Sequence, residues 1–114
     1  MIPLIYHQSL NLEKWSSFSK MQQVLMVANE LNRAQNWISK NENNESNLAY
    51  ERAFELIYLT VADQKWKSSR KEWLRLKETI GELYTQTKKD IHLNNLCLSL
   101  LTSFSTESYN MLQK

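Results

Sequence analysis

The stretch from Ser19 to Lys40, SKMQQVLMVANELNRAQNWISK, decides the fold of this chain. Ser19 and Gln22 stand three residues apart at its start, which is the spacing of a helix N-terminal capping box. The residues that follow recur at the 3.6-residue period of an amphipathic helix. This apolar stripe consists of Met21, Val24, Leu25, Ala28, Leu31 and Ile38. We therefore predict a long helix over about residues 19–40.

Glycine and proline are almost absent from the rest of the chain. Its 114 residues include one of each, Gly81 and Pro3. Because these two residues build tight turns and break helices, the composition favours long helices joined by polar loops. The asparagine-rich segment 41–47 is the clearest such loop.

Three further helices are predicted after this loop, over about residues 47–63, 69–87 and 90–104. The 47–63 helix has a core stripe, and the 69–87 helix begins at a capping box of Ser69 and Glu72. The 90–104 helix can be capped by Thr87 or Asp90. Gly81 falls inside the 69–87 helix, where we expect a neighbouring helix to approach closely. The core stripe of the 47–63 helix is Ala49, Ala53, Leu56, Ile57 and Thr60.

These segments predict an all-α, up-down four-helix bundle that forms a single domain over residues 1–114. Residues 1–17 would be an apolar lead-in that ends near Trp15. The tail from Thr106 could add a short C-terminal helix around Tyr109 and Leu112.

Composition also limits the compartment and the kind of partner. No stretch approaches the ~20 apolar residues that a membrane helix needs, and residues 1–6 lack the features of a secretory signal. The single cysteine, Cys97, agrees with a reducing compartment, so we expect a cytoplasmic protein without a membrane partner. The net charge is +2, and residues 65–114 carry 9 basic against 5 acidic residues, which permits an acidic partner.

Catalytic signatures are missing from the sequence. The histidines, His7 and His92, are far apart, and neither belongs to the Glu-x-x-His pair of a di-iron bundle. Cys97 lies on an apolar stripe, where a thiol is usually a small core side chain. We therefore expect no catalytic residue, no metal and no cofactor, and a protein that is not an enzyme.

Helix faces remain as the candidate functional surfaces. Met26, Glu30, Arg33 and Trp37 lie opposite the predicted stripe of the first helix. Methionine, arginine and tryptophan are enriched in interface cores, so we predict an outward interaction face there and a homodimer as its simplest use.

A charged set spans two of the predicted helices, with Glu30 and Arg33 on the 19–40 helix and Glu51, Arg52 and Glu55 on the 47–63 helix. Glu51 and Glu55 are one turn apart and repel each other unless a cation lies nearby, and Arg33 could supply it. The set is either an ordinary solvated face or an ion network between helices or subunits.

A basic segment suggests an alternative function in binding RNA or DNA. Its candidate contacts are Lys67, Arg70, Lys71 and Arg75, and tryptophans are interleaved with them. Lys71 and Arg75 share a face with Glu78 and Glu82, however, so a mixed salt-bridged surface is the simpler interpretation.

Four strings carry a family resemblance: WSSFSK at 15–20, ANELNRA at 28–34, ERAFELIYLT at 51–60 and RKEWLRLKE at 70–78. They resemble small bacterial and archaeal helical proteins that look related to HEPN-like four-helix bundles. Such bundles are often encoded beside minimal nucleotidyltransferases in toxin–antitoxin-like pairs. The resemblance covers residues 15 to about 84.

This resemblance implies a bundle and a nucleotidyltransferase partner. HEPN ribonucleases carry an arginine followed, after four to six residues, by a histidine, and this sequence has no such pair. No catalytic residue is therefore carried over, and the function expected is that of a non-catalytic interaction protein.

Overall fold

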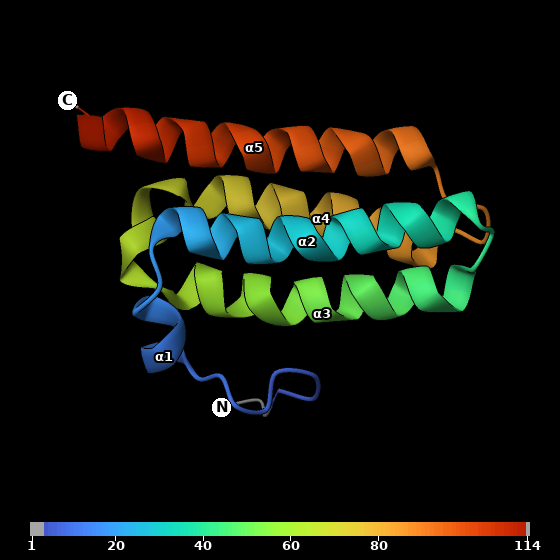
Figure 1. Cartoon of the computed structure of the whole chain (residues 1–114), viewed down its shortest axis with the longest axis horizontal. Coiled ribbons are helices and arrows are strands. Elements are labelled where there is room, and N and C mark those ends of the chain that lie inside the picture. The colour runs from blue at the N-terminus through green and yellow to red at the C-terminus, as the bar shows by residue number, and fades with distance from the viewer. Residues whose placement is uncertain (1–3, 114) are drawn as a thin grey trace.

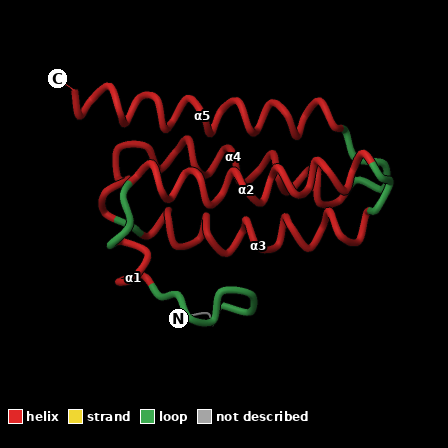
Figure 2. The backbone as a smooth tube through the Cα atoms, viewed as in Figure 1, coloured by secondary structure: helices red, strands yellow, loops and turns green. Residues whose placement is uncertain are grey.

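A bundle of four long helices, alternating in direction, forms the body of the molecule (Figure 1). The computed structural model describes residues 4–113, with side chains described as far as Phe104. No strand occurs in this range, as the tube in Figure 2 makes plain. The elements are α1 (Leu12–Ser16), α2 (Lys20–Ser39), α3 (Asn43–Ala62), the 3₁₀ segment η1 (Gln64–Ser69), α4 (Arg70–Thr85) and α5 (Ile91–Gln113).

Each long helix packs mainly against two others. α2 lies between α3 and α5, and α4 packs on α3 and α5 from the other side. Neighbours in sequence are therefore neighbours in space, which confirms the predicted all-α up-down bundle. The core combines large apolar side chains from every long helix, including Leu31, Leu56, Ile57, Leu76, Ile80 and Leu101.

The first predicted helix is confirmed together with its capping box. The Gln22 N–H donates to Ser19 Oγ at 3.1 Å, and the Ser19 N–H donates to Gln22 Oε1 at 2.8 Å. The predicted core face of this helix is rotated by about one residue from the face that is buried in the structure. Met21 and Leu25 are 44% and 53% exposed, whereas Val27 is buried, because the space between α3 and α5 sets which face is covered.

The predicted loop at 41–47 is mostly helical, since α3 begins at Asn43. The turn between α2 and α3 is therefore short, and Asn41 adopts a φ of 59° within it. Asparagine tolerates this left-handed region better than most residues, so it serves here where glycine is usual. The predicted stripe of the 47–63 helix is buried throughout.

The predicted capping box at Ser69 is wrong, because Ser69 makes no side-chain cap to α4. The preceding residues form η1, which leads directly into α4. Asp63 caps this segment instead, and its Oδ1 accepts the Lys65 N–H at 3.0 Å. The fourth predicted helix begins as expected, with Asp90 Oδ1 accepting the His92 N–H at 3.0 Å.

Both ends of the chain differ from the prediction. α5 continues without interruption to Gln113, so the end expected at 104 and the separate C-terminal helix are wrong. The side chains of Tyr109 and Leu112 lie outside the described residues. In the lead-in, Leu12–Ser16 forms α1, and the buried Trp15 donates its Nε1–H to Thr60 Oγ1 at 3.1 Å.

Candidate functional site

The face predicted on α2 does not point outward as a unit. Glu30 is buried, with 5% of its surface exposed, and Met26 and Trp37 are half-buried. Of the four residues only Arg33 is exposed. The premise of an outward face is therefore wrong, because this side of α2 turns toward α3.

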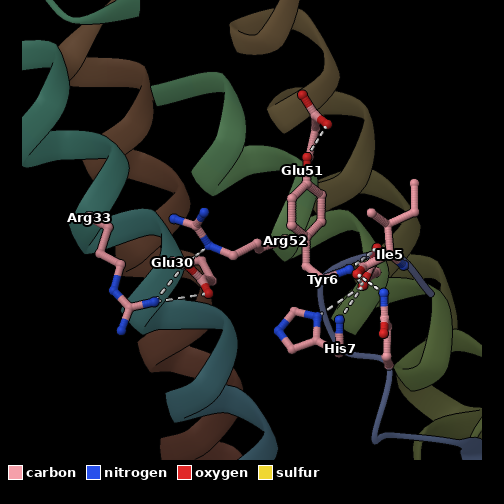
Figure 3. A network of polar contacts seen from close by, with 9 residues as sticks. Ile5, Tyr6, His7, Glu30, Arg33, Glu51 and Arg52 are labelled. Atoms are coloured by element: carbon pink, nitrogen blue, oxygen red, sulfur yellow. Dashed lines mark hydrogen bonds and ion pairs between the residues drawn. The ribbon is translucent and has the colours of Figure 1, made fainter. Parts of the chain in front are cut away.

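Glu30 instead joins α2 to α3 through an ion cluster (Figure 3). Its Oε1 accepts from Arg52 Nε at 2.9 Å, and Arg33 Nη1 lies 3.2 Å from both carboxylate oxygens. The predicted charged set does contain an inter-helix ion network, which consists of Glu30, Arg33 and Arg52. Arg33 pairs with Glu30 one turn away and does not supply the cation expected for Glu51 and Glu55.

Glu55 holds the N-terminal segment against α3. We call residues 4–10 the strap. The N–H groups of Ile5, Tyr6 and His7 donate to the Glu55 carboxylate at 2.8, 3.1 and 3.1 Å, and His7 Nδ1 lies 3.0 Å from Oε1. Partial burial acts to raise the pKa of Glu55, but these hydrogen bonds outweigh it and hold the pKa below its ordinary value.

Glu51 lies one turn before Glu55 and accepts two phenol hydroxyls. Tyr6 OH donates to Oε1 at 2.7 Å and Tyr84 OH donates to Oε2 at 3.1 Å. The bond to this carboxylate is the main cause that raises the pKa of each tyrosine. The strap, α3 and α4 thus meet at one carboxylate.

Beside this junction an open groove of about 360 Å³ runs between α3 and α4. The ring of Phe54 packs edge-on against Tyr84, with their centroids 5.8 Å apart. Leu74 borders the same region and is 41% exposed. The groove is lined by Phe54, Leu74, Lys77, Glu78 and Gly81.

Gly81 lies in the lining without a close neighbour. A Cβ built there would meet no atom within 4 Å, apart from its own chain neighbours and helix backbone. The close helix approach predicted at this position is therefore wrong. The missing side chain leaves open space in the groove.

The basic segment is partly used inside the fold. Arg70 is half-buried and its Nε donates to the Val61 carbonyl at 2.9 Å. Lys67, Lys71 and Arg75 are exposed. The neighbouring tryptophans, Trp66 and Trp73, are both buried, so they present no surface on which nucleic-acid bases could stack.

Cys97 is fully buried in α5, as predicted for a core thiol. Burial raises its pKa to about 11, so the reactive thiolate is rare at neutral pH.

Among the described residues, no group of three or more His, Cys, Asp or Glu side chains is arranged to hold a metal ion. Within the same residues, no helix combines the length and hydropathy that crossing a membrane requires.

Sequence analysis predicted neither the strap nor the groove. Glu55 and its donors are separated by 48 to 50 residues, so no local spacing connects them. The groove depends on how α3 and α4 pack.

Comparisons with known proteins add no further identification. No family model matches the chain, and the searches of curated proteins and of solved structures gave no match.

Proposed function

We propose that this protein is a non-catalytic helical interaction protein that binds a partner protein through the groove between α3 and α4. The open space above Gly81 carries this proposal. A glycine inside a helix destabilises it by roughly 0.5–1 kcal/mol relative to alanine. An apolar side chain from a partner would fill the space, which gives the glycine a role in the complex.

The surroundings of Gly81 support this use. Phe54 and the exposed Leu74 provide apolar contact, while Lys77 and Glu78 add charges at the edge. An apolar centre with a polar rim is the usual composition of a protein interface. The groove lies between two long helices, so an amphipathic helix laid along it is the partner element that fits best.

The resemblance of residues 15–84 to HEPN-like bundles favours a minimal nucleotidyltransferase as the partner, in a toxin–antitoxin-like pair. We place this pair in the cytoplasm, in agreement with the single cysteine. A homodimer stays a prediction, but the Met26–Trp37 face is not an outward surface for it, because Glu30 is buried.

The test compares how three forms of the chain bind a purified minimal nucleotidyltransferase. Gly81→Leu fills the groove, whereas Ser99→Leu adds the same side chain on an exposed face of α5. Calorimetry should show a complex with the unmodified chain and with Ser99→Leu, and about a hundredfold weaker binding with Gly81→Leu, the scale of a lost interface anchor.

Equal binding by Gly81→Leu and Ser99→Leu would exclude the groove as the interface. The absence of any complex with that enzyme would remove the nucleotidyltransferase as the partner.

A further inference from the structure

The strap is held to α3 mainly through its main chain. Three consecutive N–H groups converge on Glu55, and two side chains add to them, since Tyr6 OH donates to Glu51 and His7 Nδ1 lies 3.0 Å from Glu55. The His7 side chain is 18% exposed. Ile5 is 70% exposed and Tyr6 is 38% exposed. A carboxylate that binds main-chain N–H groups makes few demands on the identity of those residues, so another segment could take the same place.

The receptor side of this contact belongs to two packed helices, whereas the strap is an irregular segment. Glu51 and Glu55 stand one turn apart on α3, and Tyr84 on α4 fixes Glu51 from the other side. The strap at residues 5–7 has no helical hydrogen bonds of its own and is anchored by the half-buried Leu4 and Leu10. Its removal would leave two carboxylates in place on a helix.

The charges around these carboxylates favour a cationic occupant. Arg52 lies between Glu51 and Glu55 in sequence but pairs with Glu30, as does Arg33. The donors from the strap and α4 are main-chain amides, phenols and the His7 imidazole. A segment with a permanent cation at the position of His7 would place a positive charge beside the Glu55 carboxylate, which a neutral imidazole does not supply.

We propose that the outer face of α3 at Glu51 and Glu55 is a peptide-binding site, and that the strap is its internal occupant. The site takes a bent segment of a partner chain that presents three consecutive free N–H groups, the last of which belongs to an arginine or lysine. Such a segment competes with a tethered strap, so its apparent affinity is lowered by the effective concentration of the strap. This site is separate from the groove and does not depend on the proposed function.

The probe is a labelled peptide with the sequence of residues 4–10, carrying the change His7→Arg. Its binding is measured by fluorescence anisotropy to the full chain and to the full chain with Tyr6→Pro. Proline removes both the N–H and the hydroxyl that residue 6 contributes, which weakens the internal competitor. The peptide should bind the Tyr6→Pro chain about tenfold more tightly than the unmodified chain, and adding Glu55→Gln should abolish this gain.

Two controls separate the site from other surfaces. The same peptide methylated at the three main-chain nitrogens should not bind, and Gly81→Leu should leave peptide binding unchanged because it alters the groove alone. Equal peptide affinity for the unmodified and Tyr6→Pro chains, or affinity indifferent to Glu55→Gln, would overturn the proposal.

A second measurement uses the unmodified chain and avoids any effect of proline on folding. Hydrogen exchange at the amides of residues 5–7 should accelerate when unlabelled peptide is added, because the strap is displaced. Unchanged exchange at saturating peptide contradicts an exchange of occupants.

Discussion

Glu30 is a buried charge at the contact between α2 and α3. The carboxylate is 6% exposed and Arg52 is 25% exposed, whereas Arg33 is 59% exposed. A buried carboxylate must be compensated, and the less exposed arginine is screened less by water. The two arginines should therefore contribute unequally.

A double-mutant cycle measures this inequality. Glu30→Ala should lower the free energy of unfolding by about 2 kcal/mol, because it leaves Arg52 without its partner. The coupling energy of Glu30 with Arg52 should exceed that with Arg33, which we expect at about 0.5 kcal/mol or below. Urea unfolding of the single and double variants gives both values, and equal couplings would contradict the burial argument.

Gly81 gives a second prediction at this scale. Gly81→Ala should raise the free energy of unfolding by roughly 0.5–1 kcal/mol, because the added methyl meets open space and restricts the unfolded chain. Thermal or urea unfolding measures the change. A loss of stability would mean that a side chain at this position meets an obstruction.

The burial of individual residues shows how much the helical periodicity of the sequence could predict. Cys97 and the stripe of α3 were assigned correctly to the core, since α3 is covered on a broad face. Met21 and Leu25 were assigned wrongly, because an apolar residue at the edge of a stripe is buried only if a neighbouring helix covers that edge. Glu30 was wrongly predicted to face outward. Its partner Arg52 lies 22 residues away, so no local spacing indicates that the carboxylate is buried and paired.

At the scale of elements, Gln23 connects α1, α2 and η1. Its Nε2 donates to the Trp15 carbonyl at 2.7 Å and to Asp63 Oδ2 at 3.0 Å, while its Oε1 accepts from Trp66 Nε1 at 2.7 Å. The side chain is fully buried. A polar group in such a place fixes one arrangement of the elements around it.

Gln23→Ala should therefore be severely destabilising, by about 3 kcal/mol, since it leaves buried donors and acceptors unpaired. Gln22→Ala is the matched control on the exposed side of the same turn and should cost about 1 kcal/mol or less, through the capping box alone. Chemical denaturation of the two variants compares them directly. Equal losses would show that the buried network contributes nothing beyond local helix stability.

The strap gives a prediction about pH. Because the folded-state pKa of Glu55 is lowered, this carboxylate contributes stability above its unfolded pKa, and the contribution is lost as the pH falls through the folded value. The lowered pKa of Asp63 acts in the same direction, so a difference measurement is needed. The gap in unfolding free energy between the unmodified chain and Glu55→Gln should be about 1 kcal/mol at pH 7 and should shrink below about pH 4.

A gap that persists unchanged into strongly acidic solution would contradict the assignment of this stability to the Glu55 carboxylate.

The helices themselves were predicted better than the residues at which they begin and end. Helices of 16 to 23 residues give a long periodic signal, while the start of α3 within an asparagine-rich segment depends on a turn that one left-handed residue completes.

For the whole molecule, the order of the helices around the bundle followed from short connections, which force consecutive helices to be antiparallel neighbours. The strap and the groove could not follow in this way. Each arises from residues far apart in sequence, as Glu55 with Ile5 and Phe54 with Leu74 show. The sites with a proposed function are thus the parts that depend most on tertiary packing.

The distribution of the four tryptophans gives the bundle two optically different ends. Trp15, Trp66 and Trp73 are buried near η1, and the rings of Trp66 and Trp73 lie 5.2 Å apart. Trp37 lies at the opposite end, half-buried beside the α2–α3 turn, with Lys40 above its ring. The tryptophan emission of the chain is therefore a sum of a shielded cluster and one partly exposed indole, and in a Trp37→Phe chain it would come only from the η1 end.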